Sequence, residues 1–164
     1  MCIRISFIII GVALLASAVG CDVKNEPKGV DRIIYTVDSG AILPELQLHE
    51  VYTITRTGVD LVRSGKSSDT HVYEGEWAFS ADEGLLTKLF TIAEGGDCTA
   101  YKRVEPEEPL DGGETVTIQL VYTDDSDCTL TYDPGTTYEG AEELLRKARE
   151  VIENLTARVI VVPK

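Results

Sequence analysis

The sequence predicts an α+β domain with a mainly antiparallel β-sheet and two amphipathic helices packed on one face. Three observations support this fold class. Short segments that alternate apolar and polar residues are separated by turn sequences, as in antiparallel strands. Two other segments repeat apolar residues at helical spacing. The expected elements follow in the order strand, hairpin, helix, strand, hairpin, helix and strand, which is typical of α+β domains.

The first part of the domain is expected to consist of strands. Residues 31–37 alternate and are rich in Ile, Tyr and Val, and the turn sequence Asp38-Ser39-Gly40 ends this strand. A β-hairpin is expected over residues 46–63, because apolar residues alternate on both sides of the turn Thr57-Gly58. A short strand over residues 71–79 contains the only tryptophan.

A first helix is expected to begin at the capping-box sequence Ser80-Ala81-Asp82-Glu83, in which the Ser80 hydroxyl caps an amide three residues on. Gly95-Gly96 supplies the stop. Residues 98–104 then predict a strand, and residues 105–113 an acidic loop that contains proline. The apolar residues of the helix follow at helical spacing and are Leu85, Leu86, Leu89, Phe90 and Ala93.

The clearest hairpin comes next, with arms over residues 115–123 and 128–132 and an aspartate-rich turn between them. A second capping box, Thr136-Thr137-Tyr138-Glu139, predicts a second helix with acidic residues in its first turn and basic residues further along. Residues 157–162 are β-branched and predict the last strand. The second helix has one apolar stripe, formed by Ala141, Leu144, Leu145, Ala148, Val151, Ile152 and Leu155.

Composition and charge narrow the classes of function. A chain of 164 residues with 43% hydrophobic content is long enough for one domain with a proper core. The formal net charge is −13, whereas nonspecific binding to DNA or RNA depends on neutralising phosphates. Nucleic acid is therefore not expected as a partner. We find no phosphate-binding glycine loop and no dinucleotide fingerprint, so no cofactor is expected either.

The first 21 residues have the layout of a secretory signal, with Arg4 near the start and an apolar run from Ile5 to Val19. The sequence Ala18-Val19-Gly20-Cys21 resembles the lipobox of prokaryotic lipoproteins. This resemblance covers the signal alone, and Ala18 stands where leucine is usual. It implies that the Cys21 thiol receives a diacylglyceryl group and that cleavage makes Cys21 the N-terminus. The expected location is the cell envelope, anchored by lipid to the outer side of a prokaryotic membrane.

This interpretation divides the chain into a signal peptide over residues 1–20, a flexible tether over residues 21–30 and a single α+β domain over residues 31–164. Two alternatives stay open, namely a plain secretory peptide cut near Ala18 and an uncleaved anchor over residues 3–20. Both leave the domain outside the cell. Removal of the signal leaves 14 basic and 28 acidic residues, so the mature chain should be repelled by anionic headgroups.

Two of the four cysteines remain once Cys2 is removed with the signal and Cys21 is acylated. In an exported domain, Cys98 and Cys128 are most simply explained by one disulfide bond. A zinc site would need further ligands near these thiols, but the chain has no Cys-x-x-Cys pair and both histidines are distant in sequence. We therefore expect a disulfide and no metal site.

The segment Asp38-Ser39-Gly40-Ala41, which follows an apolar strand, resembles the active-site turn of retroviral-type aspartic proteases. The resemblance implies a dimer in which two aspartates share a proton and activate water. It covers four residues, and the apolar-apolar-glycine element that supports this site in the family has no convincing counterpart before a second helix here. Gly40 is also what an ordinary turn after a strand uses. A hydrolase centred on Asp38 is therefore the alternative to a non-enzymatic function.

The other polar groups are expected to be structural. The aspartates of residues 124–127 lack the glycine and distal glutamate of an EF-hand loop, and the acidic side chains of residues 105–111 predict a solvated loop. No nucleophile motif accompanies His49 or His71, which we expect at the surface or in packing. The glycosylation pattern Asn154-Leu155-Thr156 falls partly on the apolar helix stripe, so we expect it to be a chance match.

The order of the elements, with a glycine-containing turn after the first strand, is similar to that of emfourins, small proteinaceous inhibitors of thermolysin-like metalloproteases. The similarity implies inhibition of a protease as a second alternative. Because no catalytic constellation is found, the leading hypothesis is a non-enzymatic, lipid-anchored extracytoplasmic domain that binds a protein partner.

Overall fold

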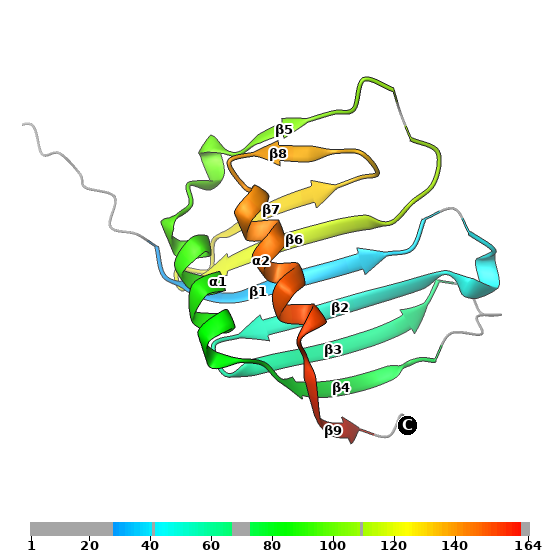
Figure 1. Ribbon diagram of the computed structural model, residues 1–164, viewed down its shortest axis with the longest axis horizontal. Helices are drawn as coiled ribbons and strands as arrows, with labels where there is room; N and C mark the ends of the chain where they lie inside the picture. Colours follow the sequence, from blue (N-terminus) through cyan, green and yellow to red (C-terminus); the bar gives the residue numbers. More distant parts are fainter. Residues whose placement is uncertain (1–27, 41, 67–72, 109, 162–164) are drawn as a thin grey trace, which may run out of the picture.

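The computed structural model describes residues 28–40, 42–66, 73–108 and 110–161. Its main element is a seven-stranded sheet in the order β7-β6-β1-β2-β3-β4-β9, in which all neighbouring strands are antiparallel (Figure 1). The predicted α+β class with a mainly antiparallel sheet is confirmed. The strands of this sheet are β1 (Val30–Asp38), β2 (Leu48–Thr55), β3 (Gly58–Gly65), β4 (Gly75–Ser80), β6 (Thr115–Tyr122), β7 (Asp127–Tyr132) and β9 (Thr156–Val161).

Two helices and a small second sheet complete the fold. The helices are α1 (Glu83–Gly95) and α2 (Glu142–Glu153). The second sheet pairs β5 (Lys102–Val104) with β8 (Thr137–Glu139). Two 3-10 turns, η1 (Pro44–Leu46) and η2 (Cys98–Ala100), precede β2 and β5. Both predicted hairpins are confirmed, since β2 pairs with β3 and β6 pairs with β7.

The core lies on one side of strands β1, β2, β3, β6 and β7, because their buried residues alternate with exposed or half-exposed ones. In β6, for example, Val116, Ile118 and Leu120 are buried, whereas the residues between them are partly exposed. The buried residues of α1 and α2 belong to the same cluster, and the two helices contact each other. A fully buried residue such as Phe90 contributes about 1.5–3 kcal/mol to stability through the hydrophobic effect.

The first helix has a different cap from the one predicted. The carboxylate of Asp82 accepts a hydrogen bond from the Leu85 amide at 2.9 Å, which makes Asp82 the N-cap residue. Ser80 is the last residue of β4 and does not cap the helix. The capping-box pattern therefore gave the correct location but the wrong residue. A carboxylate accepts hydrogen bonds from the free amides of the first turn as well as a hydroxyl does. Its negative charge also interacts favourably with the positive end of the helix dipole.

The second predicted capping box is wrong. Thr137–Glu139 forms strand β8, and α2 begins only at Glu142, after Gly140 with a φ of 88°. Residues 98–104 also differ from the expected strand, because Cys98–Ala100 is the 3-10 turn η2. Strand β8 was not predicted because it pairs with β5 over a long sequence separation, and local propensity does not reveal such pairing. The 3-10 turn η2 follows Asp97, whose carboxylate accepts a hydrogen bond from the Thr99 amide.

The fold begins before residue 31. Val30 is the first residue of β1 and is buried, and the Thr123 amide donates a hydrogen bond to the Gly29 carbonyl at 2.9 Å. Lys28 forms an ion pair with Asp124 at 3.0 Å. The last residues of the predicted tether are thus attached to the turn between β6 and β7.

The strand directions give the sheet two distinct ends, visible at the left and right of Figure 1. At the amino-terminal end, β1 begins and short turns connect β2 to β3 and β6 to β7. At the opposite end lie the connections from β1 to β2, from β3 to β4 and from β5 to β6. We call this second end the loop end, formed by the described residues within 39–47, 66–74 and 105–114.

Candidate functional site

The β1–β2 loop presents large apolar side chains to solvent. Ile42, Leu43 and Leu46 are 49%, 61% and 49% exposed. Leu43 is extended, with φ −52° and ψ 132°, and Pro44 follows it as the first residue of η1 (Pro44–Leu46). Proline has a fixed φ suited to the start of a helical turn, so the loop has a defined shape at the point where Leu43 is exposed.

Exposed apolar residues concentrate at the loop end. Across the described ranges, six large apolar side chains are strongly exposed, and five of them belong to the loop end. Besides the three of the β1–β2 loop, these are Tyr73 and Leu110, which are 62% and 59% exposed. The sixth, Val62, lies within β3. Single exposed apolar residues are normal on any protein, whereas a concentration of them is typical of a binding surface.

Two of the loops are in direct contact. A Cβ atom added to Gly40 would lie 1.5 Å from the Gly113 carbonyl oxygen, which is far inside any allowed contact. Gly113 itself has a φ of 102°, a conformation that favours glycine. The β1–β2 loop therefore lies against the β5–β6 loop, and a glycine on each side makes the close approach possible.

Hydrogen bonds brace the β1–β2 loop at its base. Ser39 and Leu48 are joined by the Ser39 amide and hydroxyl, which both donate to the Leu48 carbonyl at 3.1 Å, and the Leu48 amide donates to the Ser39 hydroxyl at 2.7 Å. Lys66 adds two bonds, from its amide to the Gln47 carbonyl and from its ammonium group to the Ser39 carbonyl, both at 3.1 Å. Inside the loop, the Gln47 side-chain amide donates to the Ile42 carbonyl.

A polar cluster beneath this loop contains the aspartate that the sequence singled out. Asp38 Oδ1 lies 3.0 Å from His49 Nδ1 and 3.1 Å from Lys66 Nζ. Partial burial raises the pKa of Asp38, but the hydrogen bonds from His49 and Lys66 outweigh it and hold the pKa below its usual value. The cluster therefore favours an ionised carboxylate at neutral pH, whereas aspartic-protease chemistry needs a proton shared between two carboxylates.

The arrangement of this cluster follows from strand register. Asp38 of β1 is opposite His49 of β2, and His49 is opposite Ser64 of β3, so the three side chains lie in a row across neighbouring strands. His49 is thus a partly exposed residue with an acidic partner. His71 lies outside the described residues.

The acidic residues of the β6–β7 turn are paired with nearby polar and basic side chains. Hydrogen bonds from Ser126, together with Lys28, lower the pKa of Asp124 to about 2. Asp127 accepts hydrogen bonds from Gln119 and Thr129. In the acidic loop, Glu105 pairs with Arg103. Over the described ranges, the structure has no group of three or more His, Cys, Asp or Glu side chains placed to hold a metal ion.

The predicted disulfide between Cys98 and Cys128 is confirmed, with a Cα–Cα distance of 5.9 Å. It connects η2 to the first part of β7. Cys21 and the signal over residues 1–20 lie outside the described residues. Asn154 follows α2 and donates a hydrogen bond from its side chain to the Glu150 carbonyl at 2.8 Å.

Comparison with protein-family models, curated proteins and solved structures gives no match for this chain. Within the part of the chain that the structure describes, no helix has the length and apolar character needed to cross a membrane.

The exposed residues of the β1–β2 loop were not predicted from the sequence. A signal was present, since Ala41, Ile42 and Leu43 form an apolar run between a glycine and a proline, outside both predicted strands. An apolar run of this kind in a segment with turn residues is unusual, because loops run over the surface. The polar brace could not be found in this way, since it depends on the register of three strands.

Proposed function

We propose that this chain is a lipid-anchored extracytoplasmic protein without enzymatic activity, and that its loop end binds a protein partner. The observation that carries the proposal is the concentration of five exposed large apolar side chains on one end of the sheet. The braced β1–β2 loop supports it, because a loop with a fixed shape loses little entropy when it binds.

The position of this surface fits an anchor at Cys21. The chain enters the fold at Lys28 and Val30, at the amino-terminal end of the sheet, and β1 then runs nine residues toward the loop end. At about 3.3 Å per residue, this strand separates the two ends by roughly 30 Å. A lipid attached to Cys21 would therefore hold the loop end away from the membrane, where a partner can reach it.

Charge indicates the chemistry of the partner. The exposed acidic residues Glu107, Glu108, Asp111 and Glu114 belong to the loop end, beside Leu110. A surface with apolar centres and acidic neighbours complements an apolar cleft that is bordered by Lys and Arg. The same acidic residues would be repelled by anionic headgroups, which favours a protein over a lipid surface as the partner.

We also propose that α1 and α2 cover the same face of the sheet. Support comes from the single core cluster that both helices share with the buried strand residues and from the contact between Arg149 of α2 and Tyr35 of β1. Both helices are drawn on the same side of the strands in Figure 1. The opposite face would then carry the exposed and partly exposed residues of the strands, among them Thr53, Thr117 and Val62.

Inhibition of a protease is the second candidate. The β1–β2 loop favours it, because Leu43 is extended, exposed and followed by proline on a hydrogen-bonded loop. Protease inhibitors bind through such pre-organised surfaces with little change of backbone shape. Inhibition of a purified metalloprotease or serine protease by the wild type, lost in Leu43→Asp, would establish this special case.

The anchor is tested by metabolic labelling with palmitate. The wild type and Cys2→Ser should take up the label, and Cys21→Ser should not, because only Cys21 would carry the lipid. A labelled Cys21→Ser protein would overturn the lipid anchor.

The partner surface is tested by affinity isolation of the detergent-extracted protein from envelopes of the producing cell. A partner should be recovered with the wild type and with Val62→Asp. With Ile42→Asp/Leu43→Asp, the amount of partner recovered should be lower by at least about tenfold, as for residues at the centre of an interface. Val62 is a matched control because it is exposed and apolar but lies within β3. Equal recovery with the loop variant would overturn the proposal.

A further inference from the structure

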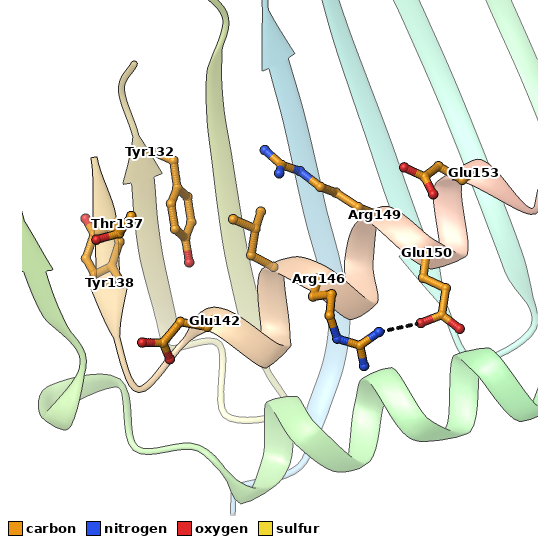
Figure 2. Close-up of a pocket in the computed structure, with 9 residues that line it drawn as sticks. Tyr132, Thr137, Tyr138, Glu142, Arg146, Arg149, Glu150 and Glu153 are labelled. Atoms are coloured by element: carbon orange, nitrogen blue, oxygen red, sulfur yellow. Dashed lines mark hydrogen bonds and ion pairs between the residues drawn. The ribbon is translucent and has the colours of Figure 1, made fainter. Parts of the chain in front are cut away.

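A cavity of about 470 Å³ lies beside α2, β7 and β8 (Figure 2). Its volume falls in the range of small-molecule binding sites, roughly 300–1,000 Å³. None of its lining residues belongs to the loop end, so it is independent of the surface proposed above. The lining residues are Tyr132, Thr137, Tyr138, Glu142, Leu145, Arg146, Arg149, Glu150 and Glu153.

One wall of the cavity is apolar. The rings of Tyr132 and Tyr138 pack edge to face with their centroids 5.0 Å apart, and Leu145 of α2 adds an aliphatic side chain. Aromatic and aliphatic groups of this kind provide area for the body of a ligand, while a few polar groups orient it.

The charged residues of α2 differ in whether they already pair with a residue of opposite charge. Arg146 pairs with Glu143 and Glu150, and Lys147 also pairs with Glu150. Arg149, by contrast, has no ion pair within the described ranges, and its one polar contact is the Nε donor to the Tyr35 hydroxyl at 3.4 Å. Most of the five N–H donors of its guanidinium group are therefore available to a ligand.

A second unsatisfied group belongs to Tyr132, a residue that lines the same cavity. Tyr132 is 6% exposed, and its hydroxyl has no hydrogen-bond partner among the described residues. Burial raises the pKa of Tyr132, so the hydroxyl remains a donor at any physiological pH. Buried polar groups in folded proteins nearly always have a partner, so a missing one calls for an explanation such as a bound water molecule or a ligand.

The hydroxyl is not directly open to solvent, so a ligand must displace a side chain to reach it. Figure 2 shows Glu142 on the hydroxyl side of Tyr132. Glu142 is exposed and accepts a hydrogen bond from the Gly140 amide, and a rotation of its side chain would open a path.

We propose that this cavity binds a small organic carboxylate with an apolar body. The carboxylate accepts hydrogen bonds from Arg149 and the Tyr132 hydroxyl, and the body packs on Tyr138 and Leu145. Arginine is well suited to this role because its planar donors match a carboxylate. The nearby Glu142, Glu150 and Glu153 carboxylates disfavour a more highly charged anion such as phosphate.

Amide NMR spectra of the full mature protein in detergent, titrated with phenylacetate, test the proposal. Saturable shifts are expected at residues of β7 and α2, whereas phenethylamine and inorganic phosphate should cause none. Arg149→Gln should weaken phenylacetate binding by about tenfold or more, since a charge-assisted hydrogen bond is lost. Arg32→Gln is the matched control, because Arg32 is exposed, pairs with Asp31 and does not line the cavity.

Tyr132→Phe separates a binding role from a structural one. The variant should weaken phenylacetate binding by about threefold to tenfold, yet its melting temperature should equal or exceed that of the wild type, because the removed hydroxyl has no partner in the free protein. A lower melting temperature would show a structural partner for the hydroxyl and remove it from the proposed site. Absence of phenylacetate shifts, binding of phenethylamine instead, or unchanged binding by Arg149→Gln would each overturn the carboxylate site.

Discussion

The two ends of the sheet are built from the same strands, but they differ in how far their side chains are covered by other parts of the protein. At the amino-terminal end, Glu94 of α1 accepts hydrogen bonds from Arg56 and from the Val30 amide, and the disulfide joins η2 to β7. At the loop end, large apolar side chains face solvent above a polar brace. Polar contacts thus stabilise both ends, and the difference lies in the apolar side chains, since among the described residues those left exposed are concentrated at the loop end, where they are available for binding.

The disulfide should have the largest effect on stability. Cys98→Ser/Cys128→Ala opens a loop of 30 residues and should lower the free energy of unfolding by about 3 kcal/mol, because the unfolded chain regains conformational entropy. Urea unfolding of the variant and of the reduced wild type should agree with each other. If both were as stable as the oxidised wild type, the disulfide would not stabilise the amino-terminal end.

Glu94→Ala should have the next largest effect. It removes the partner of Arg56 and of the Val30 amide, whose hydrogen bond to Glu94 measures 3.1 Å. We expect a loss of about 1–2 kcal/mol in urea unfolding, because a partly buried amide is left without its acceptor. Glu76→Ala is the control, since Glu76 is exposed within β4 and should change stability by less than about 0.5 kcal/mol.

Asp38→Asn should have a smaller and pH-dependent effect. The pKa of Asp38 is lowered in the folded protein, so its ion pairs stabilise the fold above the unfolded pKa, and this contribution is lost as pH falls through the folded pKa. The variant should be less stable at pH 7 by about 0.5 kcal/mol, a small value because the pairs are partly exposed to solvent, and equal to the wild type in strong acid.

The same variant separates the two functional classes. Unchanged partner binding in Asp38→Asn would be consistent with a purely bracing role, whereas a hydrolytic activity with an acidic optimum that disappears in this variant would favour the aspartic-type enzyme. Asp31→Asn, in which an exposed pair with Arg32 is removed, is the control and should leave partner binding unchanged.

Leu43→Asp should have the smallest effect on stability. Its side chain is mostly exposed, so we expect a change within about 0.5 kcal/mol in thermal unfolding, even though partner binding is lost. A large destabilisation would mean that the loop is part of the core and would remove the contrast between the two ends.

Much of the fold could be predicted because its signals are local. The alternation of Val116, Ile118 and Leu120 identifies β6, and the spacing of Leu86 and Leu89 identifies α1. Strand β8 was missed because its pairing with β5 is not local, and the pattern from Thr136 to Glu139 matches a helix start by chance. Outside this short second sheet, the N-cap of α1 was also assigned to the wrong residue, Ser80 instead of Asp82.

The candidate sites were less predictable than the fold. Exposure of Ile42 and Leu43 depends on how the loops meet. The brace depends on Lys66, which follows β3, reaching Ser39, which follows β1. The cavity of Tyr132 and Arg149 requires α2 to lie beside β7 and β8. The cysteine pair is the exception, because counting the cysteines of an exported chain was sufficient to predict Cys98 and Cys128.

The contact between Gly40 and Gly113 affects how a mutational scan of this protein should be interpreted. Any side chain at position 40 would force the β1–β2 loop away from the β5–β6 loop, since its first carbon would overlap a carbonyl oxygen. Every substitution at Gly40 should then register as a loss of binding, as at a residue that contacts the partner. Gly40 has no side chain with which to make such a contact. A ranking of positions by their tolerance to substitution alone would therefore place Gly40 in the interface, although its role is to keep two loops together.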